Sequence, residues 1–161
     1  MKKNNYLILP IFFLIFISAC VGYEPIFKFA NVQFKISEYS IEGDKILGNK
    51  IYSKLNNLTK SKKDHTNSRS IRLVIDSSKN KKETSKDTTG KILEYKITLN
   101  TIIEINDYQT NSKILYQTFT SSITYKMQDR YSDSVKLENK SIDNLIEKTY
   151  QELIVRISEN I

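Results

Sequence analysis

Cys20 is the residue that points most specifically to a chemical reaction in this sequence. It is the single cysteine, and two small residues, Ser18 and Ala19, precede it. A thiolate is a strong nucleophile that can accept a diacylglycerol group as a thioether. The small side chains leave room for a peptidase at the preceding peptide bond. Isolated cysteines are more often inert buried thiols, but this one directly follows an apolar segment. We therefore expect Cys20 to be acylated.

The residues before Cys20 have the three-part layout of a secretory signal. Lys2 and Lys3 come first, an apolar run over residues 6–17 follows, and small residues end the segment. A transmembrane anchor is the alternative, but the apolar segment is shorter than the roughly 20 residues that a spanning helix needs. The run Ile17-Ser18-Ala19-Cys20 resembles the bacterial lipobox. We predict a lipoprotein signal peptide over residues 1–19 and a lipidated tether over residues 20–31.

The lipobox resemblance implies N-acyl and S-diacylglycerol chains on Cys20, and several chains together give stable membrane attachment. In well-studied Gram-negative bacteria an aspartate after the cysteine retains a lipoprotein in the inner membrane, whereas this chain has Val21. The expected location is therefore the outer membrane, with the anchor in its periplasmic leaflet.

The net charge of +7 would favour an anionic partner. Most of the basic residues are lysines in a chain also rich in asparagine and isoleucine, so much of this charge is expected to be solvated surface. An exported lipoprotein does not meet chromosomal DNA, so we expect lipid head groups and no nucleic acid as partners. With its one cysteine acylated, the chain cannot form an internal disulfide.

Alternating and helical patterns over residues 32–161 predict one domain. Strands are expected at residues 32–37, 71–75, 93–105 and 115–127, the third being the clearest because its apolar residues fall on odd positions. Gly43 and Asp44 provide a turn and a helix cap before the stripe Leu47, Ile51, Leu55 and Leu58. Residues 59–70 are expected to be a loop, 76–90 a long mobile hairpin loop, and 106–112 a hairpin turn.

A last helix is expected after Ser132 and Asp133, which can cap it. Its apolar stripe consists of Val135, Ile142, Leu145, Ile146, Leu153 and Ile157. Two helices with one stripe each can cover the single apolar face of a four-stranded sheet. The predicted fold is α+β: a two-layer α/β sandwich in the order β-α-β-β-β-α, with a mixed sheet and both helices on one face. A first strand followed by a helical crossover would pair in parallel with the second.

These features together resemble one family. The residues that carry the resemblance are the lipobox, the run from Gly22 through Pro25 to Phe27, the element order, and the pair Glu94-Tyr95 after Gly90. They are similar to the LptE (rare lipoprotein B) family of LPS-assembly lipoproteins, particularly its shorter alphaproteobacterial-type members. The resemblance implies a protein without enzymatic activity that plugs the lumen of the LptD β-barrel in a 1:1 complex, assists its assembly and binds lipopolysaccharide. It implies no cofactor beyond the lipid on Cys20.

The resemblance also implies lipopolysaccharide contacts by basic residues near loop ends, where lipid A phosphates can accept charge-assisted hydrogen bonds. The candidates in this chain are Lys79, Lys81, Lys82, Lys86, Lys91 and Lys136. Each could instead be a solvated charge. The chain departs from the family pattern at Thr88, where the better-known member carries an arginine.

Catalytic and metal sites are not expected. His65 is the single histidine, lies in a polar segment and has no second histidine or cysteine to share a metal with. No nucleophile elbow or glycine-rich phosphate loop is present. The alternative function is an accessory periplasmic lipoprotein of a lipid-transport ABC system, or an activator of an envelope synthase.

Overall fold

The computed structural model describes residues 34–60 and 68–160. The signal peptide, Cys20, the tether and His65 therefore lie outside the described residues. The described elements follow the predicted order β-α-β-β-β-α: β1 (Phe34–Gly43), α2 (Lys45–Lys60), β2 (Arg69–Lys86), β3 (Ile92–Asp107), β4 (Lys113–Lys126) and α3 (Tyr131–Asn160).

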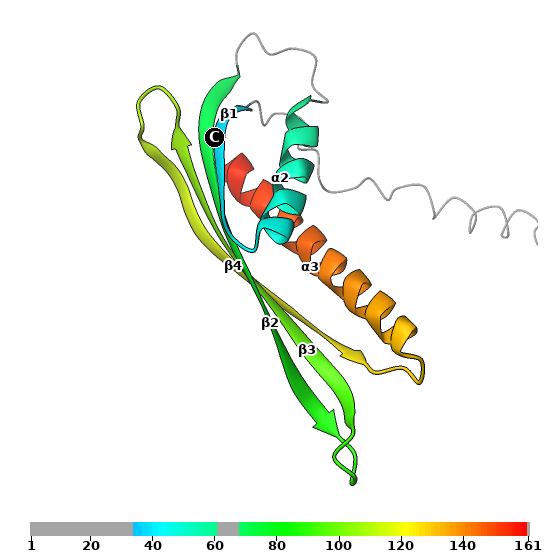
Figure 1. The fold of residues 1–161 in the computed structure, drawn as a ribbon. Helices are drawn as coiled ribbons and strands as arrows, with labels where there is room; N and C mark the ends of the chain where they lie inside the picture. Colours follow the sequence, from blue (N-terminus) through cyan, green and yellow to red (C-terminus); the bar gives the residue numbers. More distant parts are fainter. Residues whose placement is uncertain (1–33, 61–67, 161) are drawn as a thin grey trace, which may run out of the picture. The chain divides into compact units, whose positions relative to one another are not determined.

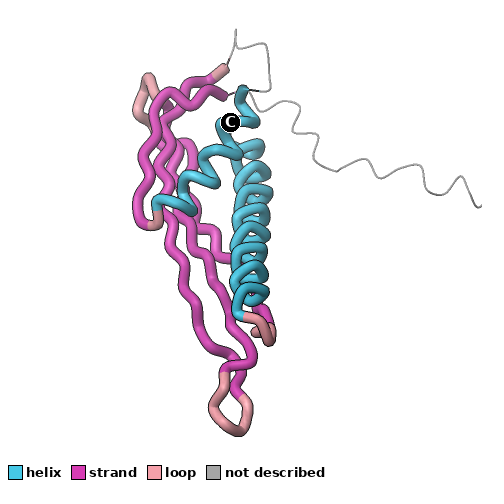
Figure 2. The backbone as a smooth tube through the Cα atoms, turned by 45° about the vertical axis from the view of Figure 1, so that its right-hand side comes forward, coloured by secondary structure: helices cyan, strands magenta, loops and turns pink. Residues whose placement is uncertain are grey.

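The four strands form one mixed sheet in the spatial order β1-β2-β3-β4. β1 and β2 are parallel, as expected for strands joined by a helix, and the other two neighbouring pairs are antiparallel. Both helices cover the same face of the sheet (Figures 1 and 2). α2 packs on β1 and β2, α3 packs on β4 and β3, and the helices contact each other. The predicted two-layer α+β fold is confirmed.

The core lies between the helices and the odd-numbered side chains of β2, β3 and β4. Its buried members on the sheet include Ile71, Leu73, Ile75, Ile97, Leu99, Ile103 and Ile105, and on the helices Leu47, Ile51, Leu55, Leu145, Ile146, Leu153 and Ile157. Thr101 interrupts the apolar series of β3 but is fully buried opposite Ser77 of β2, and the two hydroxyl oxygens are 3.5 Å apart. Of the predicted α3 stripe, only Val135, near the beginning of the helix, is exposed.

A bulge at Ser37 explains why the alternation of β1 fades after its first residues. The pairing with β2 passes from Ile36 to Glu38 while β2 advances by one residue, so Ser37 has no partner. An extra residue shifts the face that following side chains occupy. Ile36 before the bulge and Tyr39 after it therefore lie on the helix-covered face, where Tyr39 stacks on Tyr52 of α2.

The prediction of a long mobile loop over residues 76–90 was wrong. β2 continues to Lys86 and pairs with β3 along almost its whole length, leaving a short turn at residues 87–91. The sequence Ser-Ser-Lys-Asn-Lys-Lys has no apolar alternation because its helix-facing positions are filled by polar contacts, Ser77 with Thr101 and Lys81 with Glu138. Only the tip of the hairpin extends beyond both helices (Figure 2). Backbone pairing with the strongly β-forming β3 determines the strand there, so side-chain burial leaves no pattern.

The predicted turn and cap at Gly43 and Asp44 are confirmed. Gly43 has a φ of +64°, and a Cβ there would lie 2.3 Å from the carbonyl oxygen of Ser77. The Asp44 carboxylate accepts hydrogen bonds from the backbone N–H groups of Ile46 and Leu47.

At the second helix the predicted cap was wrong. α3 begins at Tyr131, so Ser132 and Asp133 lie inside its first turn. The buried hydroxyl of Ser134 instead bonds to the backbone of Gln128 and fixes the connection from β4.

Candidate functional site

Five of the six candidate lysines lie on the β2–β3 hairpin, whose tip extends beyond α3 (Figure 1). Lys79, Lys81, Lys82 and Lys86 belong to β2, and Lys91 lies just before β3. Lys136 lies in α3 and is not part of this group. We call the hairpin from Lys79 to Lys96 the basic hairpin. Register decides what each lysine can do, because successive residues of a strand point to opposite faces.

Lys81 points toward the helices and is engaged there in a four-residue cluster. Its Nζ lies 2.6 Å from Oε2 of Glu138 on α3, and the hydroxyl of Tyr125 on β4 donates to the same oxygen at 2.8 Å. The ammonium also lies 4.3 Å from the centroid of the Tyr95 ring, a cation–π distance. Lys81, Tyr95, Tyr125 and Glu138 thus join three strands to α3, and we call them the hairpin clamp.

Electrostatics favour the charged forms of the ion pair in the clamp. Burial alone would lower the pKa of Lys81, but hydrogen bonds to Glu138 and Tyr125 outweigh it and raise that pKa. Burial likewise opposes ionisation of Glu138, yet the bonds from Lys81 and Tyr125 lower the pKa of Glu138. Burial raises the pKa of Tyr125. The clamp therefore holds a neutralised pair at physiological pH, and Lys81 is a positioning residue for the hairpin.

Two further candidates are also paired. Lys86 lies 2.6 Å from Glu83, and Lys136 lies 3.7 Å from Asp133. At the hairpin turn, Oδ1 of Asp87 accepts hydrogen bonds from the hydroxyl of Thr89 and from the N–H groups of Thr89 and Lys91, and these contacts, the hydroxyl bond above all, lower the pKa of Asp87. The carboxylate thus orders the tip of the hairpin without pairing with the Lys91 ammonium.

Lys82 points to the face of the sheet that the helices leave open, and there it lies directly opposite Lys96 of β3. Like charges in directly opposed positions repel. Within residues 34–60 and 68–160, neither ammonium has an ion-pair partner, and the same is true of Lys79 and Lys91. Such a pair can accept an anion between its two ammonium groups. Sequence reasoning missed Lys96 because only strand register places it opposite Lys82.

The open face of the sheet is mainly polar. Its side chains are mainly hydroxyls and amides, including Ser78, Asn80, Thr98, Asn100, Thr118, Thr120, Ser122 and Thr124. Thr120 donates a hydrogen bond to Asn100 across the strands at 2.9 Å. Val74 and Ile102 are half-buried apolar residues on this face. The face is thus suited to contact with water or with another polar surface.

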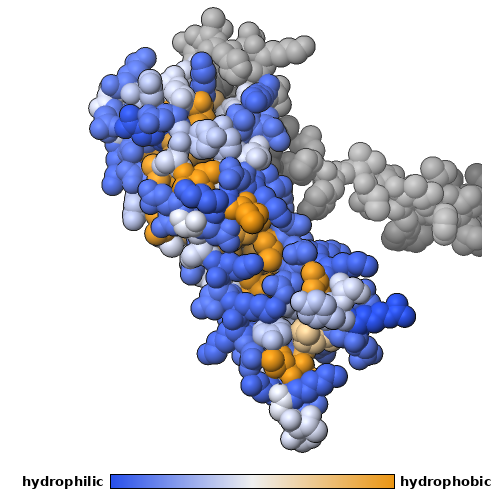
Figure 3. Space-filling view, viewed as in Figure 1, coloured by the Kyte–Doolittle hydropathy of each residue, from blue (hydrophilic) through white to orange (hydrophobic). Residues whose placement is uncertain are grey.

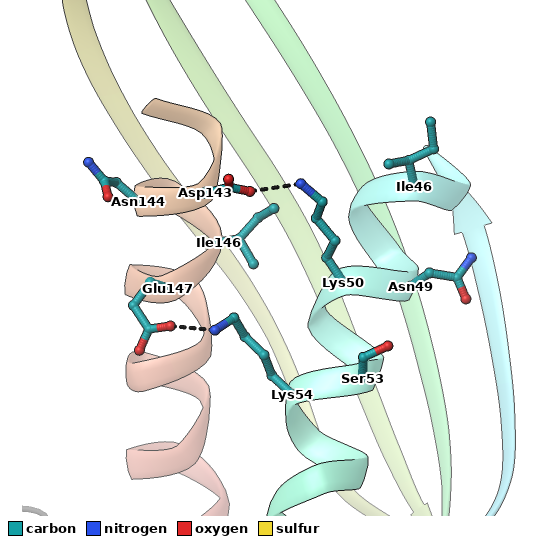
Figure 4. A pocket seen from close by; sticks show the side chains of 9 residues that line it. All are labelled: Ile46, Asn49, Lys50, Ser53, Lys54, Asp143, Asn144, Ile146 and Glu147. Atoms are coloured by element: carbon teal, nitrogen blue, oxygen red, sulfur yellow. Dashed lines mark hydrogen bonds and ion pairs between the residues drawn. The ribbon is translucent and has the colours of Figure 1, made fainter. Parts of the chain in front are cut away.

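A groove of about 800 Å³ lies between α2 and α3 (Figure 4). Two ion pairs bridge it one helical turn apart: Lys50 with Asp143 at 2.7 Å and Lys54 with Glu147 at 2.6 Å. Lys54 lowers the pKa of Glu147. Because each basic group across the groove is already paired, the groove is better explained as the seam of two packed helices than as a binding site.

The surface seen in Figure 3 is mainly hydrophilic, and its hydrophobic residues are divided among several patches. No helix in the described ranges is long and apolar enough to cross a membrane. In the same ranges, no three histidine, cysteine, aspartate or glutamate side chains come together as a metal site would require.

Comparison with known proteins gives the fold a context. No protein-family model matches the chain, and no curated protein matches its sequence. Among solved structures, a minor lipoprotein from Acinetobacter baumannii superposes with a TM-score of 0.53 at 17% identity, covering 79% of this chain and 94% of that one. An uncharacterized lipoprotein B from Nitrosomonas europaea superposes with a TM-score of 0.55 at 13% identity, covering 79% of this chain and 85% of that one. A Caulobacter crescentus structure also superposes with a TM-score of 0.55, at 10% identity, covering 75% of this chain and 86% of that one. At these identities the likeness establishes a shared fold.

Proposed function

We propose that this chain is an outer-membrane lipoprotein, anchored through Cys20, that plugs and assists the assembly of an LptD-type β-barrel and binds lipopolysaccharide there. The proposal assigns it no enzymatic activity and a 1:1 stoichiometry with the barrel. The observation that carries it is the open polar face of the sheet together with the basic hairpin. The lipobox-like run at Cys20 and the shared fold with two structures named as lipoproteins support it.

The open face suits the inside of a large barrel. Lumen walls of such barrels are polar and hydrated. Hydroxyl and amide side chains such as those of Thr98, Asn100 and Thr120 can exchange hydrogen bonds with such a wall directly or through water. The helices cover the apolar face, so the domain can enter an aqueous lumen without exposing its core.

The basic hairpin suits a phosphorylated lipid. Lys82 and Lys96 repel each other across the strands, and a phosphate between them would relieve that repulsion while accepting charge-assisted hydrogen bonds. Lys79 and Lys91 lie on the same hairpin and form no ion pair in the described part of the chain, although Lys79 helps to lower the pKa of Glu138 and Lys91 that of Asp87. Lys81, Lys86 and Lys136 are weaker candidates, because carboxylates already pair with them.

Copurification tests the barrel partner. A tag on the full chain, expressed in its own membrane, should capture an outer-membrane barrel in equimolar amount, and depletion of the chain should reduce lipopolysaccharide at the cell surface. Recovery of a membrane ATPase or an envelope synthase in place of the barrel would contradict the proposal and favour the alternative function.

Paired charge removal tests the ligand. Lys82→Gln with Lys96→Gln should weaken binding of purified lipopolysaccharide by about tenfold, because charge-assisted bonds to phosphate are lost. Lys113→Gln with Lys140→Gln removes the same charge elsewhere and should leave affinity unchanged. Equal weakening in both variants would mean that net charge, and not this pair, determines binding. Dephosphorylated lipid should not distinguish the variants.

A further inference from the structure

We propose that the free edge of β4 pairs with β4 of a second copy of this chain, joining two four-stranded sheets in a closed two-fold dimer. The proposal concerns the chain without its barrel partner and does not rest on the proposed function. The edges of the sheet differ in how well they are protected against further strand pairing. β4 is the last strand in the order β1-β2-β3-β4, so one side of it pairs with no strand in the described chain.

The other exposed edges carry the features that block edge-to-edge pairing. The β1 edge has charged residues and the bulge at Ser37. β1 ends opposite Ser77, so the remainder of β2 is also an edge, and that stretch holds four lysines and two register shifts. Lysines and bulges are the usual protection of edge strands. Pairing of a further strand with either of these two edges is therefore disfavoured.

The β4 edge lacks that protection. Between Lys113 and Lys126 the strand reads Ile-Leu-Tyr-Gln-Thr-Phe-Thr-Ser-Ser-Ile-Thr-Tyr, with no charged residue and no proline. Its single register shift lies at its beginning, opposite Asn106. A long, regular, uncharged edge is a ready template for another strand.

Backbone direction shows which residues offer the pairing groups. The N–H of Met127 donates to the carbonyl of Leu93, which lies opposite it in the β3–β4 register. Hydrogen-bonded and non-bonded pairs alternate along an antiparallel ladder. The N–H and C=O groups of Thr118, Thr120 and Ser122 therefore point away from β3. The side-chain amide of Gln117 donates to the carbonyl of Thr118, as expected for a carbonyl outside the ladder.

The flank of α3 beside this edge favours a second copy as the occupant. A groove of about 440 Å³ runs along residues 117–120 and is lined on the helix side by Glu152, Val155, Arg156 and Glu159. With Lys148, which lies 4.0 Å from Glu152, the charges along this flank alternate in sign. A two-fold axis beside residue 154 reverses the order of the second flank, so that Arg156 of one copy faces Glu152 of the other and Lys148 faces Glu159. Because each chain has one such edge among its described strands, the pairing closes at two copies.

Removal of one outward N–H tests the proposal. The full chain, purified in density-matched detergent without a barrel, should sediment as a dimer that dissociates on dilution. Thr120→Pro removes an N–H that points away from β3, a position where an edge strand tolerates proline, and should raise the dimer dissociation constant at least about tenfold. Thr120→Val is the matched control: it also loses the hydroxyl bond to Asn100 but keeps the N–H, and it should still dimerise.

A second pair of variants keeps the test valid if the proline disturbs folding. Ser122→Lys places a charge on the β4 edge and should also yield a monomer, whereas Asn80→Lys places it on the β2 edge and should not. Circular dichroism must show a folded chain in each case. A wild-type chain that is monomeric up to about 100 μM, a concentration at which even modest affinities are populated, overturns the proposal. A dimer that survives in both Thr120→Pro and Ser122→Lys also overturns it. The proposal fails as well if the chain is monomeric and the β4 variants abolish binding of a different protein.

Discussion

Replacement of Glu138 by leucine is the sharpest test of the hairpin clamp. The carboxylate accepts one hydrogen bond from Lys81 and one from Tyr125, at 2.6 and 2.8 Å. A bond to a charged group contributes about 1.5–3 kcal/mol when buried. The side chains of Lys81 and Glu138 are 35% and 23% exposed, so solvent screening roughly halves that contribution. We expect Glu138→Leu to lower the free energy of unfolding by about 2 kcal/mol.

A double-mutant cycle isolates the ion pair. Lys81→Met keeps an apolar stem over the Tyr95 ring while it removes the charge. In the Glu138→Leu background this change should be nearly neutral, because an unpaired charge is then removed, whereas alone it should destabilise. The expected coupling is about 1 kcal/mol. Glu83→Leu breaks the exposed pair with Lys86 and serves as the matched control, with a much smaller effect.

Urea unfolding of the full chain provides the assay. The protein has no tryptophan, so far-ultraviolet circular dichroism follows the backbone and the near-ultraviolet signal follows the packing of its tyrosines, Tyr95 and Tyr125 among them. The pKa of Lys81 is raised, so its contribution is complete below its unfolded pKa of about 10.5 and is lost at higher pH. The pKa of Glu138 is lowered, so its contribution is complete above about 4.5 and is lost as pH falls. If Glu138→Leu shifts the midpoint no more than Glu83→Leu at pH 7, the clamp reasoning is wrong.

Two further predictions concern single residues. Asp107 accepts backbone hydrogen bonds from Thr110 and Gln109 and pairs with Arg69 at 2.7 Å, and these contacts hold the pKa of Asp107 below its usual range. Asp107→Asn should therefore lower the urea midpoint at pH 7. Below about pH 4 the midpoints of variant and wild type should approach each other, because the contribution of a lowered carboxyl pKa is lost there. If the two midpoints differ by the same amount at every pH, the charge of Asp107 is not the cause. Gly48→Ala should destabilise by about 1 kcal/mol although alanine favours helices, because the new Cβ would lie 2.3 Å from Cγ2 of Ile41. In an Ile41→Ala background the same change should stabilise the protein. Thermal melts of the wild type, the two single variants and the double variant measure this, and a destabilised double variant would show that the clash with Ile41 is not the cause.

The sequence by itself determined the order of elements and most of the core. Alternation along residues 93–105 and the helical stripes at Leu47 and Leu145 arise from burial on one face, and burial is recorded directly in residue types. The turn at Gly43 was also predictable, because glycine and an aspartate cap are local features. The lipidation at Cys20 remains a prediction from the same local sequence, outside the described residues.

Only the tertiary structure decided where β2 ends and what the lysines do. Lys79, Lys81 and Lys82 are alike in sequence, but strand register turns Lys81 toward Glu138, a residue 57 positions away in the chain, and sets Lys82 opposite Lys96. No local pattern encodes such contacts, because they join polar side chains that are far apart in the sequence. The unprotected edge of β4 likewise exists only once the strand order makes β4 the last strand of the sheet.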